Sequence, residues 1–204
     1  VTGGAKRIGR AICLRLSKEG YSIAVHYRDS RQEAEEVVSA IDASGGNAFS
    51  IDANLADAES ASALVSRASE YGPLCAIVNN ASLFEYDDAA SATRESWDAH
   101  MSVNLRAPFV LAQGFAAGLP SGAAGAIINI LDQRVWNLTP HFMTDTVSKA
   151  GLWTLTQTLD LVLDPAIREH ASGAAARNTT RTDELATLGA GGLPAEPGAP
   201  PCPH

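Results

Sequence analysis

The 204-residue chain is poor in cysteine, in aromatic residues and in basic side chains. Its cysteines, Cys13, Cys75 and Cys202, have no metal-binding spacing and are too few for a disulfide framework, which favours a reducing, cytoplasmic environment. Lys and Arg number 15 against 23 Asp and Glu, giving a net charge of −8, so we expect no nucleic-acid surface. No apolar run approaches the roughly 18 residues of a membrane span, and the histidines lack ligand spacing, so we expect neither membrane nor metal.

What the chain does have is a hydrophobic content of 46%, enough for a packed core. Short apolar runs alternate with longer, helix-length stretches through residues 1–168. Runs that are apolar along their whole length are typical of strands covered on both faces, so the alternation predicts an α/β fold with a doubly wound parallel sheet, of the Rossmann type. The expected strands are 21–27, 47–51, 74–78 and 126–131, and the expected helices are 8–19, 31–43, 57–70, 94–118 and 144–163.

The last 36 residues, 169–204, differ in composition. They contain 5 of the 10 prolines and 5 of the 17 glycines, whereas Leu185, Leu188 and Leu193 are their only Leu, Ile, Val or Phe residues. This composition offers little to pack into a core. It predicts a low-complexity, disordered tail after a folded domain of residues 1–168.

A glycine-rich stretch runs from Thr2 to Gly9, just where a strand would turn into the first helix. Glycine permits positive φ angles and close backbone approach, and the N-terminus of the following helix offers N–H groups to a pyrophosphate. An ordinary glycine-rich turn is the alternative, because such turns are a weak signal alone. Cations within the stretch would suit an additional phosphate. The residues expected to bind a cofactor here are Gly3, Lys6, Arg7, Ile8 and Gly9.

The end of the 21–27 strand indicates which dinucleotide binds. Dinucleotide folds usually place an acidic residue there to hold the ribose 2′-OH, but this chain has His26 and Tyr27. Arg28 and Ser30 follow, and both can bind a 2′-phosphate. Asp29 weakens the case, and a solvated polar turn is the alternative. We therefore expect NADP(H) rather than NAD.

Several landmarks together resemble the short-chain dehydrogenase/reductase family. Within it the chain is most similar to pteridine reductases and to bacterial dihydromonapterin or dihydrofolate reductases. Those relatives share the Arg in the glycine-rich stretch, the His-Tyr pair and an Asn-Asn-Ala-Ser-x-Phe sequence. The matching residues here are Thr2 to Gly9 with Arg7, His26-Tyr27, Asn79 to Ser82 followed by Phe84, Asn104, and Ser148-Lys149.

The resemblance implies an NADPH-dependent reductase that acts on the C=N bond of a pterin or dihydrofolate-like substrate and forms a homo-oligomer. A carbonyl compound such as a 3-oxoacyl thioester is the rival substrate. Asn104 would hold a water in a proton relay, and Lys149 would bind the nicotinamide ribose and lower the pKa of the proton donor. Asp132 falls at the family's catalytic Ser position, which is Asp in eukaryotic pteridine reductases. Asn54, Leu55, Asn80 and Ala81 would line the cofactor, and Arg7, Ser82 and Phe84 would contact the pterin.

The chain departs from the family at the proton donor. The family motif is Tyr-x-x-x-Lys, whereas residues 145–149 begin with Asp145. Positions 145 and 149 share a helix face, so Lys149 should keep the carboxyl ionised and unable to donate a proton. Proton sharing with Asp132 is an alternative. Activity is thus expected to be impaired, and a non-catalytic NADP-binding protein or a decayed fragment without a stable fold are competing interpretations.

The two ends depart as well. Most of the family's first strand is missing before Thr2, and after Arg168 the sequence suggests neither of the family's last two strands.

Overall fold

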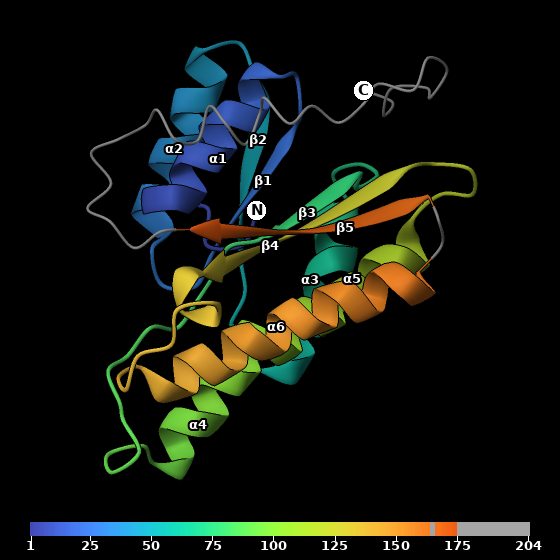
Figure 1. The fold of residues 1–204 in the computed structure, drawn as a ribbon. Coiled ribbons are helices and arrows are strands. Elements are labelled where there is room, and N and C mark those ends of the chain that lie inside the picture. Colours follow the sequence, from blue (N-terminus) through green and yellow to red (C-terminus); the bar gives the residue numbers. More distant parts are fainter. Residues whose placement is uncertain (164–165, 175–204) are drawn as a thin grey trace.

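The computed structural model describes residues 1–163 and 166–174, in which helices and strands alternate along the chain (Figure 1). The strands are β1 (Ile23–Tyr27), β2 (Ala48–Asp52), β3 (Ala76–Asn79), β4 (Gly125–Asp132) and β5 (Ile167–Ala174). The α-helices are α1 (Arg7–Lys18), α2 (Arg31–Ala43), α3 (Ala58–Ser69), α4 (Arg94–Met101), α5 (Ala107–Gly118) and α6 (Met143–Val162). A π-helical turn spans Ser102–Arg106 and a 3₁₀ turn spans Gln133–Val135.

The first four strands and all the helices lie within a few residues of their predicted positions. Local signals explain the boundaries: the Asp57 carboxylate accepts from Ser60 N and caps α3, and Thr93 and Ser96 form a reciprocal capping box at α4. The predicted helix 94–118 is divided by the π-helical turn, which the apolar periodicity does not reveal. None of the described helices is long and apolar enough to cross a membrane.

All strand pairs are parallel, in the orders β1–β2 and β3–β4–β5. The first residues of the chain lie between these two sheets and bond to both. The Val1 amine donates to Ala24 O at 3.0 Å, and Val1 O accepts from His26 N at 3.1 Å. On the other side, Thr2 N donates to Val78 O at 2.9 Å. This short segment therefore connects β1 to β3 by backbone hydrogen bonds on both of its sides, although it forms no strand of its own.

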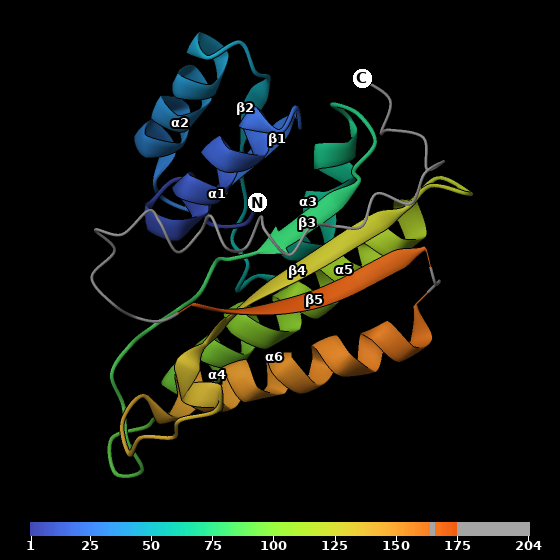
Figure 2. The same cartoon turned by 45° about the horizontal axis from the view of Figure 1, so that its top comes forward.

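The helices pack on the sheets in two groups. Helices α1 and α2 pack on β1–β2, whereas α3, α5 and α6 lie along one face of β3–β4–β5 (Figures 1 and 2). The larger core cluster lies under α3 and α5, where Leu111, Phe115 and Ile127 are almost completely buried. The predicted doubly wound parallel α/β architecture is confirmed.

Strand β5 corrects the prediction that the chain has neither of the last two strands. Residues 167–174 pair in register with all of β4, from Gly125 opposite Ile167 to Asp132 opposite Ala174. The predicted boundary between Arg168 and a tail therefore falls inside a strand. Pairing depends on backbone groups rather than on a run of apolar side chains, so the composition alone conceals this strand. Residues 175–204 of the predicted tail lie outside the described residues.

A carboxyl group from β5 is buried in the core. Glu169 is 6% exposed, and its Oε1 accepts from Asn129 Nδ2 at 2.7 Å. Asn129 also donates to Thr156 Oγ1 at 2.9 Å and accepts from Asn79 Nδ2 at 2.8 Å, so polar side chains cross three strands. Burial raises the pKa of Glu169 to about 7, and the Asn129 hydrogen bond offsets only part of this rise.

Replacing Glu169 by glutamine should stabilise the protein at alkaline pH. Because the folded-state pKa lies above the ordinary value of 4.5, the folded protein binds more protons than the unfolded chain between about pH 4.5 and 7, and stability falls as pH rises through this window. The amide keeps an acceptor for Asn129 and cannot ionise. Denaturant unfolding at pH 8 should give a free energy of unfolding about 1–3 kcal/mol higher for Glu169→Gln than for the parent.

Glu36→Gln is the matched control, because Glu36 is exposed on α2 and accepts from Gln32 at 3.2 Å. Its stability should follow that of the parent at every pH. A Glu169→Gln protein with the parent's pH dependence would show that Glu169 does not titrate in this window.

Candidate active site

The glycine-rich loop between Thr2 and α1 has the close backbone approach that its sequence predicts. Gly3 has a φ of 61°, and a Cβ atom there would lie 3.0 Å from Ala81 Cα. A Cβ at Gly9 would collide with Gly3 O, so the helix start and the loop touch through backbone alone. No larger residue fits at either position. The loop thus leads directly into the N-terminus of α1, where backbone N–H groups are free of intrahelical partners.

Thr2 and Asn80 hold this loop against the end of β3. Thr2 Oγ1 accepts from Asn80 N at 2.9 Å and from Ala81 N at 3.0 Å. In return, Asn80 Nδ2 donates to Thr2 O at 2.9 Å and to Gly3 O at 3.1 Å. The predicted cofactor residues Asn80 and Ala81 are therefore brought to the loop, and the Asn80 side chain braces it.

His26 supports the loop from the β1 side. Its Nδ1 accepts from Gly3 N at 3.0 Å, and its Nε2 lies 3.1 Å from Ala53 O. Burial lowers the pKa of His26 to about 4, so the ring is neutral, with Nδ1 as acceptor and Nε2 as donor. Both nitrogens are occupied by protein groups. His26 therefore shapes the loop, and its expected place in the cofactor site stays a prediction.

The predicted cationic residues lie on the surface around the loop. Lys6 pairs with Glu33 at 2.6 Å and Arg28 with Asp29 at 2.5 Å. Such exposed ion pairs contribute little stability, so both cations can exchange partners at little cost. Arg7 begins α1 with a φ of 48° and is exposed. Ser30 is the N-cap residue of α2, and Tyr27 lines a groove of about 390 Å³ at the edge of β2.

Asn54 and Leu55, which were both expected to line the cofactor, have different surroundings. Asn54 is exposed, but its Oδ1 accepts from Ala56 N at 3.1 Å and closes a local turn. Leu55 is 5% exposed and belongs to the core. The Asn54 amide oxygen keeps a second lone pair for a ligand, whereas the buried side chain of Leu55 leaves only its backbone for one.

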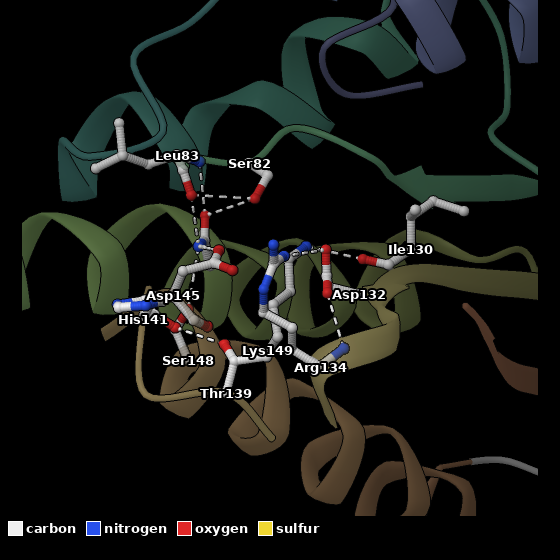
Figure 3. Close-up of polar contacts among 11 residues, drawn as sticks. Ser82, Leu83, Ile130, Asp132, Arg134, Thr139, His141, Asp145, Ser148 and Lys149 are labelled. Atoms are coloured by element: carbon white, nitrogen blue, oxygen red, sulfur yellow. Dashed lines mark hydrogen bonds and ion pairs between the residues drawn. The ribbon is translucent and has the colours of Figure 1, made fainter. Parts of the chain in front are cut away.

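Asn104 occupies the π-helical turn and is completely buried. Its Nδ2 lies 3.0 Å from Leu83 O, 3.2 Å from Asp145 Oδ1 and 3.0 Å from Ser148 Oγ (Figure 3). Its Oδ1 accepts from Leu83 N at 2.8 Å. Irregular turns of this kind often occur at functional sites, since they reorient one side chain out of the helical repeat. Asn104 thereby joins the loop after β3 to helix α6.

Asp145 and Lys149 lie one turn apart on α6, and both are buried. Lys149 Nζ donates to Ile130 O at 2.8 Å, and burial lowers its pKa. Burial raises the pKa of Asp145 to about 6, against the opposing effect of Lys149, and the Asp132 charge raises it further. The expectation that Lys149 lowers the pKa of Asp145 is therefore wrong, because desolvation outweighs the attraction, but a pKa of about 6 still leaves the carboxyl group mostly ionised at neutral pH. Oδ2 of Asp145 has no hydrogen-bond partner among the described residues.

Asp132 ends β4 and faces the same region. Its Oδ1 accepts from Arg134 N at 2.8 Å, and its Oδ2 accepts from Arg134 Nη1 at 3.1 Å. Asp132 thus caps the 3₁₀ turn while its charge reaches Asp145. Two carboxyl groups and two cations, those of Lys149 and Arg134, gather here (Figure 3).

The predicted pterin residues occupy the loop after β3. Ser82 Oγ is 3.3 Å from Asn104 Oδ1, which keeps it beside the catalytic candidates. Phe84 is 48% exposed and stacks on Phe142, with ring centroids 4.4 Å apart and planes at 8°. Arg7, by contrast, has no described contact with Ser82 or Phe84. The pterin contacts of all three stay predictions.

Several site residues were missed from the sequence. The position of Arg134, two residues after Asp132, is the one sequence feature that could have indicated its role. The ion pair itself depends on the 3₁₀ turn that brings the two side chains together. Thr2 and Ser148 were recognised only as family landmarks, and the contacts of their hydroxyl groups could not be predicted from the sequence. The buried Asp87, which accepts from Thr144 N at 3.1 Å and anchors the start of α6, lies 57 positions away in the chain. The described part of the chain contains no group of three or more His, Cys, Asp or Glu side chains that could hold a metal ion.

Comparisons with known proteins agree with this arrangement. Residues 1–186 match the family model described as short chain dehydrogenase. The chain is 35% identical over 173 residues to the 3-oxoacyl-[acyl-carrier-protein] reductase FabG of Staphylococcus aureus, covering 84% of this chain and 68% of the relative. It is 42% identical to FolM alternative dihydrofolate reductase 1 from Brucella canis, solved with NADP, with a TM-score of 0.80 and coverage of 83% and 69%.

A short chain dehydrogenase from Burkholderia cenocepacia, also solved with NADP, is 34% identical with a TM-score of 0.80, over 84% of this chain and 70% of that one. The match to the family model spans the glycine-rich loop, the Asn104 turn and the Asp145–Lys149 helix. The chain belongs to the short-chain dehydrogenase family.

Proposed function

We propose that this protein is an NADPH-dependent oxidoreductase that reduces the C=N bond of a pterin or dihydrofolate-type substrate. The observation that carries the proposal is the convergence of the glycine-rich loop, Asn104, Asp145 and Lys149 at the carboxyl ends of the parallel strands, where open α/β sheets place their sites. The similarity to a dihydrofolate reductase supports the substrate class.

The loop fits a dinucleotide. The backbone contact between Gly3 and Gly9 leaves the N–H groups at the start of α1 open to a pyrophosphate, and Arg7 and Arg28 offer cations for a further phosphate. When bound, the nicotinamide cofactor supplies a hydride. Asn80 and Ala81 would line the cofactor beside this loop, where Thr2 Oγ1 accepts from both of their backbone N–H groups.

The proton donor follows from the buried carboxyl group. Below about pH 6 Asp145 carries a proton, and its unpaired Oδ2 is free to present that proton to a substrate nitrogen. Asn104 orients Asp145 through Oδ1, and Lys149 is positioned to hold the nicotinamide ribose. Asp132 keeps the Asp145 pKa raised through its negative charge. Ser82 and Phe84 flank this region and would hold the planar ring.

A 3-oxoacyl thioester is the second candidate substrate, since FabG is among the relatives. The same donor would then protonate a carbonyl oxygen. Initial rates of NADPH oxidation with dihydrobiopterin, dihydrofolate and acetoacetyl-CoA separate the two candidates, and turnover of the thioester alone would replace the pterin proposal. Cofactor binding without turnover of any of the three would leave a non-catalytic NADP-binding protein.

The protein should bind NADPH more tightly than NADH. A charge-assisted contact to the 2′-phosphate contributes about 1.5–3 kcal/mol, so we expect roughly a ten- to hundredfold preference. Arg28→Met should remove most of it, because Arg28 is exposed and its pairing with Asp29 is easily exchanged. Fluorescence titration of both cofactors measures the dissociation constants.

Arg15→Met provides the control for the loss of one cation, since Arg15 pairs with Glu19 on the surface of α1. It should keep the preference of the parent. Equal affinities of the parent protein for the two cofactors would contradict the assignment of Arg28 and the loop cations to the 2′-phosphate.

Reductase activity should increase as pH falls through about 6. Because the protonated form of Asp145 is the donor, its fraction rises about fiftyfold from pH 8 to pH 6 for a pKa of about 6. Asp145→Asn preserves the side-chain shape and an acceptor for Asn104 but should abolish the rise in activity at acidic pH (the acid limb of the pH profile). Asp145→Tyr should instead restore activity near neutral pH, since a positioned acid contributes about 10²–10⁴-fold.

Initial rates of NADPH oxidation across pH 5.5–8.5 measure these profiles, with folding of each variant checked by thermal unfolding. Asp98→Asn is the control, because Asp98 is exposed and paired with Arg94 on α4. An acid limb that persists in Asp145→Asn would assign proton donation to another group.

A further inference from the structure

Arg134 places a constrained cation inside the proposed active site. Its side chain is only 16% exposed, and Asp132 holds both ends of the residue: Oδ1 accepts from its backbone N, and Oδ2 accepts from Nη1. A guanidinium has five N–H donors in a fixed plane, and Nη1 is the only one of its nitrogens with an acceptor in the described part of the chain. The remaining donors therefore stay available.

The same guanidinium adjoins an aromatic pair. Its central carbon lies 5.1 Å from the ring centroid of Phe84 and 4.7 Å from that of Phe142. The two rings stack on each other 4.4 Å apart. An arginine side chain that lies against aromatic rings loses little conformational freedom when it binds a ligand, because its guanidinium plane is already oriented. The arrangement combines a flat apolar surface with a fixed, directional cation.

The local charge favours an anionic group, although the chain as a whole carries −8. Arg134 and Lys149 contribute two positive charges, which Asp132 balances in part. Asp145 is largely neutral below about pH 6, where the proposed donor works. In that state the site has one uncompensated positive charge. Lys149 Nζ uses one of its three N–H donors on Ile130 O at 2.8 Å, and its proposed partner is the nicotinamide ribose, so Arg134 is the cation left for an anionic group of the substrate.

We propose that Arg134 determines substrate specificity by binding the carboxylate of a planar heterocycle that lies against Phe84. This inference rests on the proposed function and refines its substrate class: a pterin with an acidic side chain is preferred to a neutral pterin. A carboxylate can accept two parallel N–H bonds from a guanidinium, whereas a neutral hydroxylated side chain cannot use the charge. Arg134 thus distinguishes substrates by the charge of the side chain on the pterin and not by the pterin ring itself.

The test compares two substrates that share the reduced pterin ring. Dihydrofolate carries carboxylates on its side chain and dihydrobiopterin carries none. Because Arg134 also holds Asp132, Arg134→Met should lower kcat for both substrates. We expect it to raise KM for dihydrofolate roughly ten- to hundredfold more than KM for dihydrobiopterin. Arg134→Lys, which keeps the charge without the planar donor pair, should fall between. Equilibrium binding of folate and biopterin to the NADP⁺-loaded protein gives the same comparison without turnover.

Arg15→Met again controls for the removal of one surface cation and should leave both substrates unaffected. Equal losses for both substrates in Arg134→Met would show that Arg134 acts only by holding Asp132, which overturns the inference and leaves the proposed function in place. No discrimination by the parent between the acidic and neutral compounds would overturn it as well. If the parent binds and reduces neither compound, the proposed function itself fails, and this inference with it.

Discussion

The structure depends on a few hydrogen bonds made by the first four residues of the chain. Val1 bonds to β1 on one side, Thr2 bonds to β3 on the other, and Gly4 N donates to His26 O at 2.8 Å. These bonds join two sheets that do not pair directly in the described residues. They also set the path of the glycine-rich loop, since Gly3 is held between His26 and Asn80. Sheet continuity and the proposed cofactor site therefore share one set of contacts.

Burial, more than pairing of opposite charges, decides the chemistry of the site. Asp145 and Lys149 are only one helical turn apart, and in water each would favour the charged form of the other. Both are nearly excluded from solvent, which disfavours both charges and moves the two pKa values towards each other. A tyrosine at position 145 would present a hydroxyl whose ordinary pKa is near 10. A buried aspartic acid can donate too, but in a more acidic range.

The sequence predicted the order of elements well because strands covered on both faces are apolar throughout and the turns carry glycine. It also predicted Asn104, Asp132, Asp145 and Lys149, which the structure brings to one region. It failed where the outcome depends on three-dimensional surroundings. The pKa of Asp145 depends on how deeply α6 is buried, and β5 depends on backbone pairing with β4 that places Glu169 against Asn129. The support that His26 gives the loop, through its bonds with Gly3 and Ala53, likewise depends on the fold and could not be predicted from the sequence.

Asn104 joins Asp145 on α6 to the loop that carries Ser82 and Phe84. Its amide nitrogen has two hydrogens but three acceptors, those of Leu83, Asp145 and Ser148, so one contact is always shared. The contact with Asp145 is the longest of the three at 3.2 Å. Ionisation would make Asp145 the stronger acceptor and draw the amide from Leu83 O. Asn104 therefore contacts both Asp145 and the loop that would hold the substrate, because the π-helical turn places its side chain between the two.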